Sequence, residues 1–520
     1  MEIVKEKVQM LRVKSKAANQ ITFDEDYNVP DAKPDIGRMI QNKGTVQVDE
    51  VNLNDNQAYV KAKLVVELLY VEEQEEGRIC SLTASLPIEE TLNLEGIESG
   101  DKMCLKWEIE DLSLHVINSR KLNIKSILSF FAVVDELVEL ELPTGLQPEE
   151  ISMKKKVVKV LGLCIHKKDT VRMKEEVALA SNKPNIAQVL WNTVEVRGLD
   201  IRPEEDHILL KGELFMFLLY RGDEDGNSLQ WLEHSIPFYQ EVECQGCRLE
   251  MIPNVEMTML HQRLDVQPDS DGEERVVQVD AVLELDIQIY NEEEHPLLMD
   301  IYTPLKECVT RGSQEPLDSL LVKNFSKCRI GERIQVREVQ GKILQICHSQ
   351  GCVKVDSTQT VENGVLVEGV VSVKVLYIVS DDSMPFYSME AMVPFSHVIE
   401  AVGIDEHCIY HLHTDLEQLS TTMVDSNEIE VKIVLNLNAL ILNRQQEYII
   451  QEIEEHPLNM EKIQSMPGIT VYMVQPGDTL WDIAKSFYTT VEDICQLNEL
   501  EEQEVPPYRP LLLVKRVEEE

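Results

Sequence analysis

An internal repeat constrains the fold of this 520-residue chain more than any other feature. The segment KAKLVVELLY at residues 61–70 returns as KGELFMFLLY at 211–220 and as EGVVSVKVLY at 368–377. The copies begin 150 and 157 residues apart, a spacing close to the usual size of one protein domain. The repeat therefore predicts three tandem domains of related structure.

Two further landmarks keep the same distance from the repeated segment in all three copies. A proline between two hydrophobic residues lies 26 residues after the first residue of each segment, and a glycine lies 35 residues after it. The triplets are Leu86-Pro87-Ile88, Ile236-Pro237-Phe238 and Val393-Pro394-Phe395, and the glycines are Gly96, Gly246 and Gly403. Constant offsets at three landmarks argue against a chance resemblance between the copies.

Each repeated segment has apolar residues at alternate positions, as in the run from Val60 to Tyr70. Such alternation predicts a β-strand packed on a core, followed by an acidic turn and a second strand that ends at the triplet proline. A later apolar stretch, which begins at Leu122, Val277 and Ile429, predicts another strand in each copy. Each domain is therefore expected to be mainly β, as a sandwich or a strongly curved sheet.

Three connecting features complete this prediction. Lys33-Pro34 and Lys183-Pro184 precede apolar stretches in the first two copies, and proline is favoured in the first turn of a helix, so a short helix is expected after each. The segments 143–152 and 311–318 contain proline, glycine and acidic residues and predict domain boundaries. The polar linker at 454–467 is expected to leave the last part of the chain free to move.

The chain carries 93 acidic and 49 basic residues, which gives a formal net charge of −44. So strong a negative charge disfavours nucleic acids and anionic membranes as partners. The start of the chain lacks the apolar core of a secretory signal, and no apolar run reaches membrane-spanning length, so the protein is expected in the cytosol. Its eleven dispersed cysteines predict reduced thiols rather than a disulfide framework.

Residues 469–517 predict a compact unit of strand, helix, helix and strand. Tyr472 and Val474 stand at alternate positions of the first strand, which ends at a Pro-Gly turn. Asp478 and Thr479 can cap a helix with apolar residues at i, i+3, i+4 and i+7. Thr490 with an acidic residue three positions later forms the capping box of a second helix. The predicted core consists of Tyr472, Trp481, Ile483, Phe487 and Ile494.

The motif Tyr472-x-Val474-x-x-Gly477-Asp478-Thr479-Leu480-Trp481-x-Ile483-Ala484 resembles the start of a LysM domain, a βααβ module. The resemblance implies a ligand built from N-acetylglucosamine, as in peptidoglycan or chitin, in a shallow groove between residues 475–480 and 500–507. Backbone groups of such a groove bind the acetamido groups, and small apolar side chains receive the methyl groups. The residues that the resemblance assigns to ligand or partner binding are Gly477, Asp478, Thr479, Leu480, Leu500, Val505 and Pro506.

The second half of this module departs from the LysM pattern. Tyr508 stands where the pattern has a glycine, and Val514 replaces the usual proline after the last strand. Tyrosine adopts a positive φ poorly, so a different local backbone is expected. The rim glutamates Glu499, Glu501, Glu502 and Glu504 add negative charge. These changes weaken the expectation of sugar binding and favour a protein ligand.

The strand that ends in Leu-Tyr and the proline triplet that follows it resemble, in all three copies, the SPOCS domain of sporulation proteins. Three such domains followed by one LysM domain are similar to spore-coat morphogenetic proteins of the SipL type. We therefore expect a mainly β fold of three tandem, sandwich-like SPOCS domains and a small βααβ LysM domain. The predicted domains are residues 1–148, 149–312, 313–465 and 466–520.

The resemblance implies a non-enzymatic scaffold in the mother-cell cytosol at the forespore surface. Its implied partner is the coat ATPase SpoIVA, which the LysM module would bind through the altered groove. The alternative is a peptidoglycan-binding protein of the cell wall or cortex, in which the groove keeps its sugar ligand. A cell-wall hydrolase would need a catalytic arrangement, and the sequence contains no recognisable nucleophile, phosphate-loop or metalloprotease motif.

Other polar motifs favour ordinary structural roles, so no cofactor, metal ion or catalytic residue is expected. His407-Cys408-x-x-His411-x-His413 comes nearest to a metal site, because His-x-His on a strand puts two imidazoles on one face, but the other copies lack it. Cys244-Gln-Gly-Cys247 has redox spacing outside a strand-to-helix context and predicts a turn. Asp269-Ser-Asp271-Gly272 and Asp223-Glu-Asp225-Gly226 begin like calcium loops without the distal glutamate, which predicts solvated turns.

Overall fold

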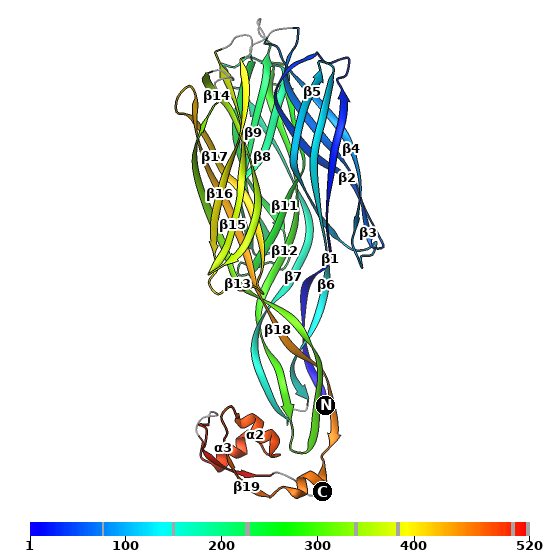
Figure 1. Cartoon of the computed structure of the whole chain (residues 1–520), viewed down its shortest axis with the longest axis vertical. Helices are drawn as coiled ribbons and strands as arrows, with labels where there is room; N and C mark the ends of the chain where they lie inside the picture. The colour runs from blue at the N-terminus through cyan, green and yellow to red at the C-terminus, as the bar shows by residue number, and fades with distance from the viewer. Residues whose placement is uncertain are drawn as a thin grey trace.

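The computed structural model describes residues 1–74, 77–147, 151–223, 229–336, 342–380, 385–500 and 505–515. Figure 1 shows three elongated β-domains side by side, a twisted stalk that leaves one end of them, and a small module at the far end of the stalk. The predicted fold class is confirmed, because strands build most of the described residues and the helices found among them lie near the C-terminus.

Six strands build each domain. The first domain contains β1 (Glu2–Asn28), β2 (Ile36–Asn54), β3 (Gln57–Glu72), β4 (Ile79–Asn93), β5 (Met103–Asn118) and β6 (Lys121–Gln147). The second contains β7 (Ser152–Ala178), β8 (Ile186–Glu204), β9 (His207–Gly222), β10 (Leu229–Glu243), β11 (Ile252–Pro268) and β12 (Glu274–Tyr302). The third contains β13 (Lys306–Gln335), β14 (Ile343–Val361), β15 (Gly364–Val379), β16 (Phe386–Glu400), β17 (Ile409–Met423) and β18 (Glu428–Pro457).

Each domain is a sandwich of two antiparallel three-stranded sheets. The sheet orders are β1-β6-β5 and β2-β3-β4 in the first domain, β11-β12-β7 and β10-β9-β8 in the second, and β13-β18-β17 and β14-β15-β16 in the third. The repeated segments are the central strands β3, β9 and β15, and their apolar faces pack in the core of their own domain. The repeat therefore marks the strand that is buried between two neighbours.

The leucine before the tyrosine that ends each repeated segment points out of its sandwich. It enters a core that all three domains share. Leu69, Leu219 and Leu376 are buried there at 1% exposure or less. Phe217 and Trp191 of the second domain fill the same core. The consecutive apolar residues at the end of each repeat therefore bury both faces of the strand, as expected for a strand covered on two sides.

Polar contacts between the domains close a ring around this shared core. The Arg38 guanidinium of the first domain donates to the Phe386 carbonyl of the third at 2.9 Å. Arg221 of the second domain donates to the Ile79 carbonyl of the first at 2.8 Å. The second and third domains meet where Glu233 lies 2.8 Å from the His348 ring. Each domain thus contacts both of the others.

The landmark glycines have the backbone conformation that requires glycine. The φ angles of Gly96, Gly246 and Gly403 are +80°, +86° and +84°, in the left-handed region that favours glycine. The N–H of Gly96 donates to the Asn56 side chain at 2.7 Å, and Gly246 donates to Asp206 in the same way. In the first domain this bond joins the turn after β4 to the hairpin before β3, and in the second it joins the turn after β10 to the hairpin before β9. The contact explains why the glycine keeps a constant distance from the repeated segment.

Two local predictions about the repeats are wrong. The triplet prolines, Pro87 among them, lie inside β4, β10 and β16, because these are edge strands and a missing N–H can face outward there. The helices expected after Pro34 and Pro184 are strands β2 and β8, which pair with the central strands. The Pro34 carbonyl accepts a hydrogen bond from the Tyr70 hydroxyl at 2.9 Å, and the Pro184 carbonyl accepts one from the Tyr220 hydroxyl at 3.3 Å.

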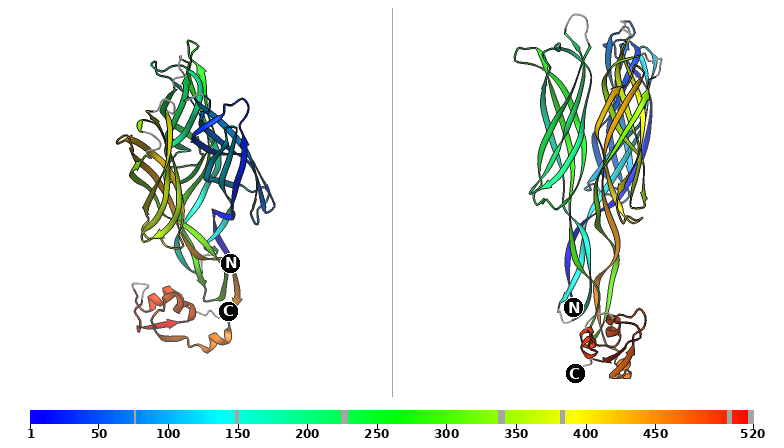
Figure 2. Two further views of the ribbon diagram at one scale, coloured as in Figure 1. Left: turned by 45° about the horizontal axis from the view of Figure 1, so that its top comes forward. Right: turned by 90° about the vertical axis from the view of Figure 1, so that its left-hand side faces the viewer.

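The stalk consists of strand ends that continue beyond the three sandwiches. Figures 1 and 2 show the outer parts of β1 with β6, β7 with β12, and β13 with β18 as three twisted ribbons that wind together. Two-stranded ribbons are marginally stable alone. Here they enclose two apolar cores: Val8, Met10, Leu142, Val158, Val160, Leu297, Leu317 and Ile449 in one, and Leu146, Leu298, Ile301 and Ile450 in the other.

The predicted boundary between residues 312 and 313 lies inside β13. Gly312 sits at a register shift of that strand, and a Cβ there would lie 1.9 Å from the Ile449 carbonyl oxygen. A close backbone approach within the stalk therefore accounts for this glycine. We propose to place the second boundary at the turn between β12 and β13 instead, which corresponds to the connection between β6 and β7.

The C-terminal module contains α1 (Met460–Ser465), β19 (Ile469–Met473), α2 (Leu480–Ser486), α3 (Val491–Leu497) and β20 (Pro510–Val514). The predicted order of strand, helix, helix and strand is confirmed. The expectation of a mobile linker at 454–467 is wrong, because β18 extends to Pro457 and α1 follows it. The Lys515 ammonium also donates to the Ile463 carbonyl in α1 and to the Met466 carbonyl just after it. None of the helices in the described ranges is long and apolar enough to cross a membrane.

The stalk core predicts a specific loss of stability. Leu297 is fully buried among strands of all three domains. Leu297→Ala should lower the free energy of unfolding by about 2 to 5 kcal/mol, because it removes a large buried side chain and leaves a cavity. Denaturant unfolding of the full chain measures this change. Val157→Ala, at a 64% exposed position of the same stalk, is the control and should change the free energy by less than about 0.5 kcal/mol. Equal losses would contradict the shared core.

Candidate functional site on the terminal module

The two loops predicted to form the ligand groove lie next to each other. The N–H of Tyr508 donates to the Val474 carbonyl at 2.8 Å, and the N–H of Val474 donates to the Arg509 carbonyl at 3.1 Å. These bonds continue the antiparallel pairing of β19 with β20. They hold residues 475–480 beside residues 505–508, in the arrangement that the LysM resemblance implies.

Asp478 and Thr479 build the turn that leads into α2. The Asp478 carboxylate accepts hydrogen bonds from the Tyr472 hydroxyl at 2.7 Å and from the Gln475 N–H at 2.8 Å. The bond from Tyr472 raises the pKa of that phenol. Of the two candidate caps, Thr479 is the N-cap, and its hydroxyl accepts from the Asp482 N–H at 3.2 Å. Both side chains therefore fix the conformation of the turn that the resemblance assigns to the groove.

Leu480 is unavailable as a groove contact. It is 4% exposed and packs in the core of the module with Ile483, because the first turn of α2 turns this position toward the sheet. The predicted contact at Leu480 is thus corrected to a core position. Leu500 and Val505 are half-buried against the same core, whereas Pro506 is exposed.

The exposed part of the groove contains Gly477, Thr479, Pro506 and Tyr508. Gly477 has a φ of +95° and open space where a Cβ would stand. Tyr508 has a φ of +67°, so the left-handed turn expected of glycine is kept although tyrosine occupies it. The prediction of a changed backbone at this residue is wrong. A bulky residue in this region costs free energy, and here it places a 68% exposed aromatic ring beside the groove.

The charged rim is only partly described. Glu499 is exposed and follows α3 with a φ of +51°. Next to it, the Asn498 side chain accepts from the Leu512 N–H at 2.7 Å and donates to the Leu512 carbonyl at 2.8 Å, which ties the end of α3 to β20. The other predicted rim residues, Glu501, Glu502 and Glu504, lie outside the described residues.

Trp481 joins the module to the stalk. Its indole N–H donates to the Asp300 carboxylate at 2.8 Å, and its ring meets Tyr302 edge-on with centroids 4.7 Å apart. Lys485, one helical turn later, donates to both oxygens of Asp300 at 2.8 Å. Burial at this contact opposes the ionisation of Asp300, but the bonds from Lys485 and Trp481 outweigh it and lower the pKa of the carboxyl group. The predicted core position of Trp481 is corrected, since the half-buried ring lies between the module and the stalk.

The module and the stalk tip share one apolar core. Tyr302, at the end of β12, is 4% exposed and packs with Val474, Leu480 and Ile494 of the module. A register shift in β12 just before Asp300 sets the position of that carboxylate. Figure 1 shows α2 and α3 on the side of the module that faces the stalk. The module is therefore docked, with its helices turned inward.

The outer face of the two-stranded sheet carries an apolar patch that the sequence interpretation missed. Ile469, Val471 and Met473 of β19 are 64%, 68% and 47% exposed. Val514 and Leu512 of β20 stand directly opposite Ile469 and Val471, and both are exposed as well. The available signal was that the outward positions of β19, Ile469, Val471 and Met473, are all apolar, whereas a strand with one wet face typically has polar residues there.

The histidine and cysteine motifs form other structures. In the described part of the chain, no three His, Cys, Asp or Glu side chains lie close enough to hold a metal ion. The His413 ring lies 2.8 Å from the Asn254 side-chain oxygen, and burial lowers the pKa of both His411 and His413. Cys244 and Cys247 are buried in a turn, where burial raises the pKa of Cys247 to about 11. This pair therefore fills a core.

The motifs that began like calcium loops are turns where they are described. The Asp269 carboxylate accepts from the N–H groups of Asp271 and Glu273, at 2.9 and 3.1 Å. A carboxylate that caps its own turn matches the predicted solvated turn. Of the Asp223–Gly226 motif, only Asp223 belongs to the described residues.

Comparison with known proteins identifies all four parts of the chain. Residues 35–117, 185–267 and 342–424 match the SPOCS domain of SipL. Each match covers the four middle strands of one sandwich and leaves out the first and last strands, which build the stalk. Residues 472–511 match the LysM domain. No curated protein and no solved structure matches the chain significantly.

The contact at Asp300 predicts that one substitution undocks the module. Asp300→Ala removes the acceptor of both Trp481 and Lys485 and should weaken docking by about 1 to 3 kcal/mol, since both donors are partly exposed to solvent. Because the pKa of Asp300 is lowered, its contribution is present above the ordinary pKa of 3.8 and is lost as the pH falls below it. Small-angle scattering should show a larger maximum dimension, and proteolysis should cut near residue 458.

The matched control is Glu307→Ala, which removes an exposed carboxylate from the same end of the stalk. It should leave both the scattering curve and the cleavage pattern unchanged. A compact, protease-resistant Asp300→Ala variant would show that the contact does not hold the module.

Proposed function

Because the chain combines three SPOCS domains of the SipL type with a C-terminal LysM domain, we propose that it is a non-enzymatic scaffold of spore-coat assembly. It acts in the mother-cell cytosol at the forespore surface and docks on the coat ATPase SpoIVA through its LysM domain. The closed ring of three domains suits a scaffold, because Arg38, Arg221 and His348 tie each domain to its neighbours.

The observation that carries the proposal is the apolar outer face of β19 and β20. Five exposed aliphatic side chains stand together there, with no polar side chain between the paired positions. Contiguous exposed apolar patches on a folded protein mark interaction sites, and a dry aliphatic face suits a protein surface better than a hydroxyl-rich sugar. The helices that dock on the stalk lie on the opposite side, so the patch stays open in the full chain.

A second candidate function is binding of peptidoglycan in the LysM groove, as in a wall or cortex protein. The observation in its favour is the groove backbone, which keeps the left-handed turn at Tyr508 and leaves Gly477, Thr479 and Pro506 exposed. Backbone groups make many of the contacts to acetamido groups that the LysM resemblance implies. The two candidates therefore use different surfaces of one module.

Removal of the LysM domain tests the scaffold as a whole. A chain truncated after residue 465 should lose binding to purified SpoIVA and fail to collect at the forespore surface, while its SPOCS domains stay folded. Pull-down and fluorescence localisation measure these two effects. If SpoIVA binding and localisation survive the truncation, the docking proposal is wrong.

Point substitutions in the full chain separate the two surfaces. The full chain is required, because Tyr302 of the stalk completes the core of the module. Val471→Lys should weaken SpoIVA binding at least tenfold, about 1.4 kcal/mol, because it puts a charge into an apolar contact. Pro506→Trp, which fills the groove, should leave SpoIVA binding unchanged and abolish co-sedimentation with peptidoglycan where the wild type shows it.

Val157→Lys places the same charge on an equally exposed valine of the stalk and serves as the control. It should leave both ligands unaffected. The assignment to the outer face fails if Pro506→Trp, rather than Val471→Lys, removes SpoIVA binding.

A further inference from the structure

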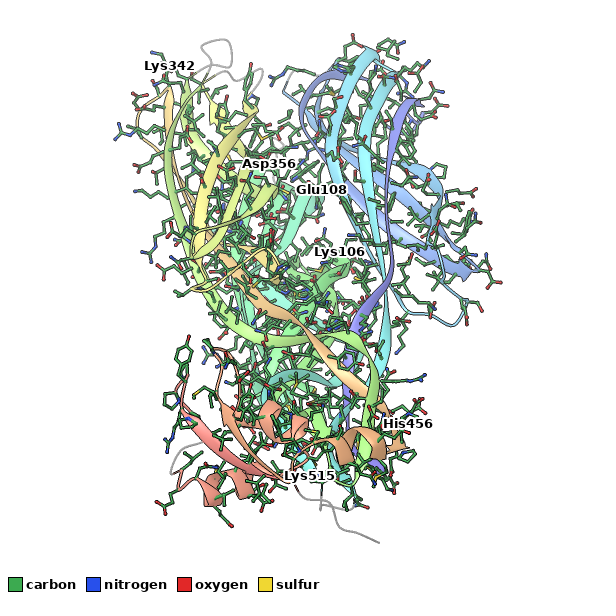
Figure 3. All side chains as sticks on the ribbon, turned by 60° about the horizontal axis from the view of Figure 1, so that its bottom comes forward. Lys106, Glu108, Lys342, Asp356, His456 and Lys515 are labelled. Atoms are coloured by element: carbon green, nitrogen blue, oxygen red, sulfur yellow. The ribbon has the colours of Figure 1, made fainter. Side chains whose placement is uncertain are left out.

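A cavity of about 350 Å³ lies where the three SPOCS domains meet. Its walls come from β5 of the first domain, from β8 and β11 of the second, and from β13, β17 and β18 of the third. Figure 3 places Lys106, one of the lining residues, between the first domain and the other two. Cavities of this size at domain interfaces are common sites for small ligands.

Lys323 on β13 is a lining cation without a carboxylate partner. Its ammonium group donates to the Pro253 carbonyl at 3.2 Å. Among the residues that the structure describes, no Asp or Glu oxygen lies within 4.0 Å of it. Burial lowers the pKa of Lys323 to about 8, although Asp200 at longer range opposes this effect. The ammonium also lies 5.0 Å from the centroid of the Phe325 ring. The cavity therefore holds a positive charge with a carbonyl and an aromatic ring beside it, but with no carboxylate in direct contact among the described residues.

Asp415 on β17 is the corresponding anion. Its carboxylate accepts from the Leu199 N–H at 3.3 Å and from the Asn436 side chain at 3.5 Å, both uncharged donors. Within the described ranges, no Lys, Arg or His nitrogen lies within 4.0 Å of it. Burial raises the pKa of Asp415, which is the sign of a carboxylate without a counter-ion.

The other charged groups of the cavity are paired. Lys106 lies 2.7 Å from Glu256, which also faces the His413 ring at 3.7 Å. Asp200 lies 2.8 Å from Arg202. Lys323 and Asp415 thus remain as a cation and an anion of the lining without an ion-pair partner among the described residues. Both belong to the sheet β13-β18-β17 of the third domain, on the two strands that flank β18. An unpaired buried charge is costly, and a ligand with the opposite charge offsets that cost.

The remaining lining combines polar side chains, such as Asn254 and Asn438, with an aliphatic part. The aliphatic part includes Leu199, Ile201, Met257, Leu412 and Leu440. From this arrangement we propose that the cavity binds a small zwitterion of the amino-acid or short-peptide class. The ligand carboxylate pairs with Lys323, its ammonium group pairs with Asp415, and an aliphatic side chain packs on the apolar lining. Such a ligand would contact the second and third domains at once and strengthen their association.

The test is calorimetric titration of the full chain with four probes. Free leucine and the dipeptide Ala-Leu carry both charges, N-acetyl-Ala-Leu lacks the ammonium group, and Ala-Leu amide lacks the carboxylate. At least one of the first two should bind with a dissociation constant below about 1 mM, and each blocked form of the dipeptide should bind at least tenfold more weakly. No binding of either zwitterion, or equal binding of the blocked forms, overturns the proposal.

Substitutions locate the site. Lys323→Met and Asp415→Asn keep the side-chain volume, remove one charge each, and should weaken binding of the zwitterion at least tenfold. Lys327→Met is the matched control on the same strand, since Lys327 pairs with Glu417 at 2.7 Å and does not line the cavity. Thermal unfolding without ligand confirms that each variant is folded. Unchanged affinity in both cavity variants would show that any binding occurs elsewhere.

Discussion

The structure depends on apolar surfaces that no single domain can bury by itself. The strands that enter the stalk are far longer than the strands of ordinary sandwiches, and β13 and β18 have 30 residues each. Their outer halves form ribbons that are stable only because ribbons from the other domains cover them. At the end of the sandwiches opposite the stalk, Leu69, Leu219 and Leu376 are buried because the three domains pack against one another. Shared cores in the stalk and at the opposite end of the sandwiches therefore hold all three domains together.

The sequence encodes both the core inside each sandwich and the core shared between the domains. Only the first of these can be recognised from a single copy of the repeat. Alternation along β3 correctly predicts the face that packs in its own sandwich. Leu69 lies on the opposite face and would be read as solvent-facing in an isolated domain. The run Leu68-Leu69-Tyr70 indicates burial on both faces, yet it cannot say what covers the second face. That information exists only in the assembled ring.

The terminal module shows the same division between local and long-range signals. The caps at Thr479 and Thr490 were predictable, because each depends on a residue three positions away. Trp481 was misplaced because its partner, Asp300, lies 181 residues earlier in the chain. Leu480 was assigned to the groove by analogy, whereas the helix geometry turns it inward. Of the predicted groove residues, Gly477, Thr479 and Pro506 are exposed on turns, whereas Leu480 is buried in the core of the module.

Docking also determines which surface of the module a partner can reach. Trp481 and Lys485 turn α2 toward the stalk, so the outer face of β19 and β20 points away from it. The stalk separates this face from the SPOCS domains, which carry most of the chain's negative charge. Electrostatic repulsion between exposed charges is screened within about 10 Å at physiological salt. The stalk is much longer than that distance, since a dozen residues of extended strand span roughly 40 Å. A partner bound at the tip is therefore held rigidly through Asp300, yet beyond the reach of the acidic domains.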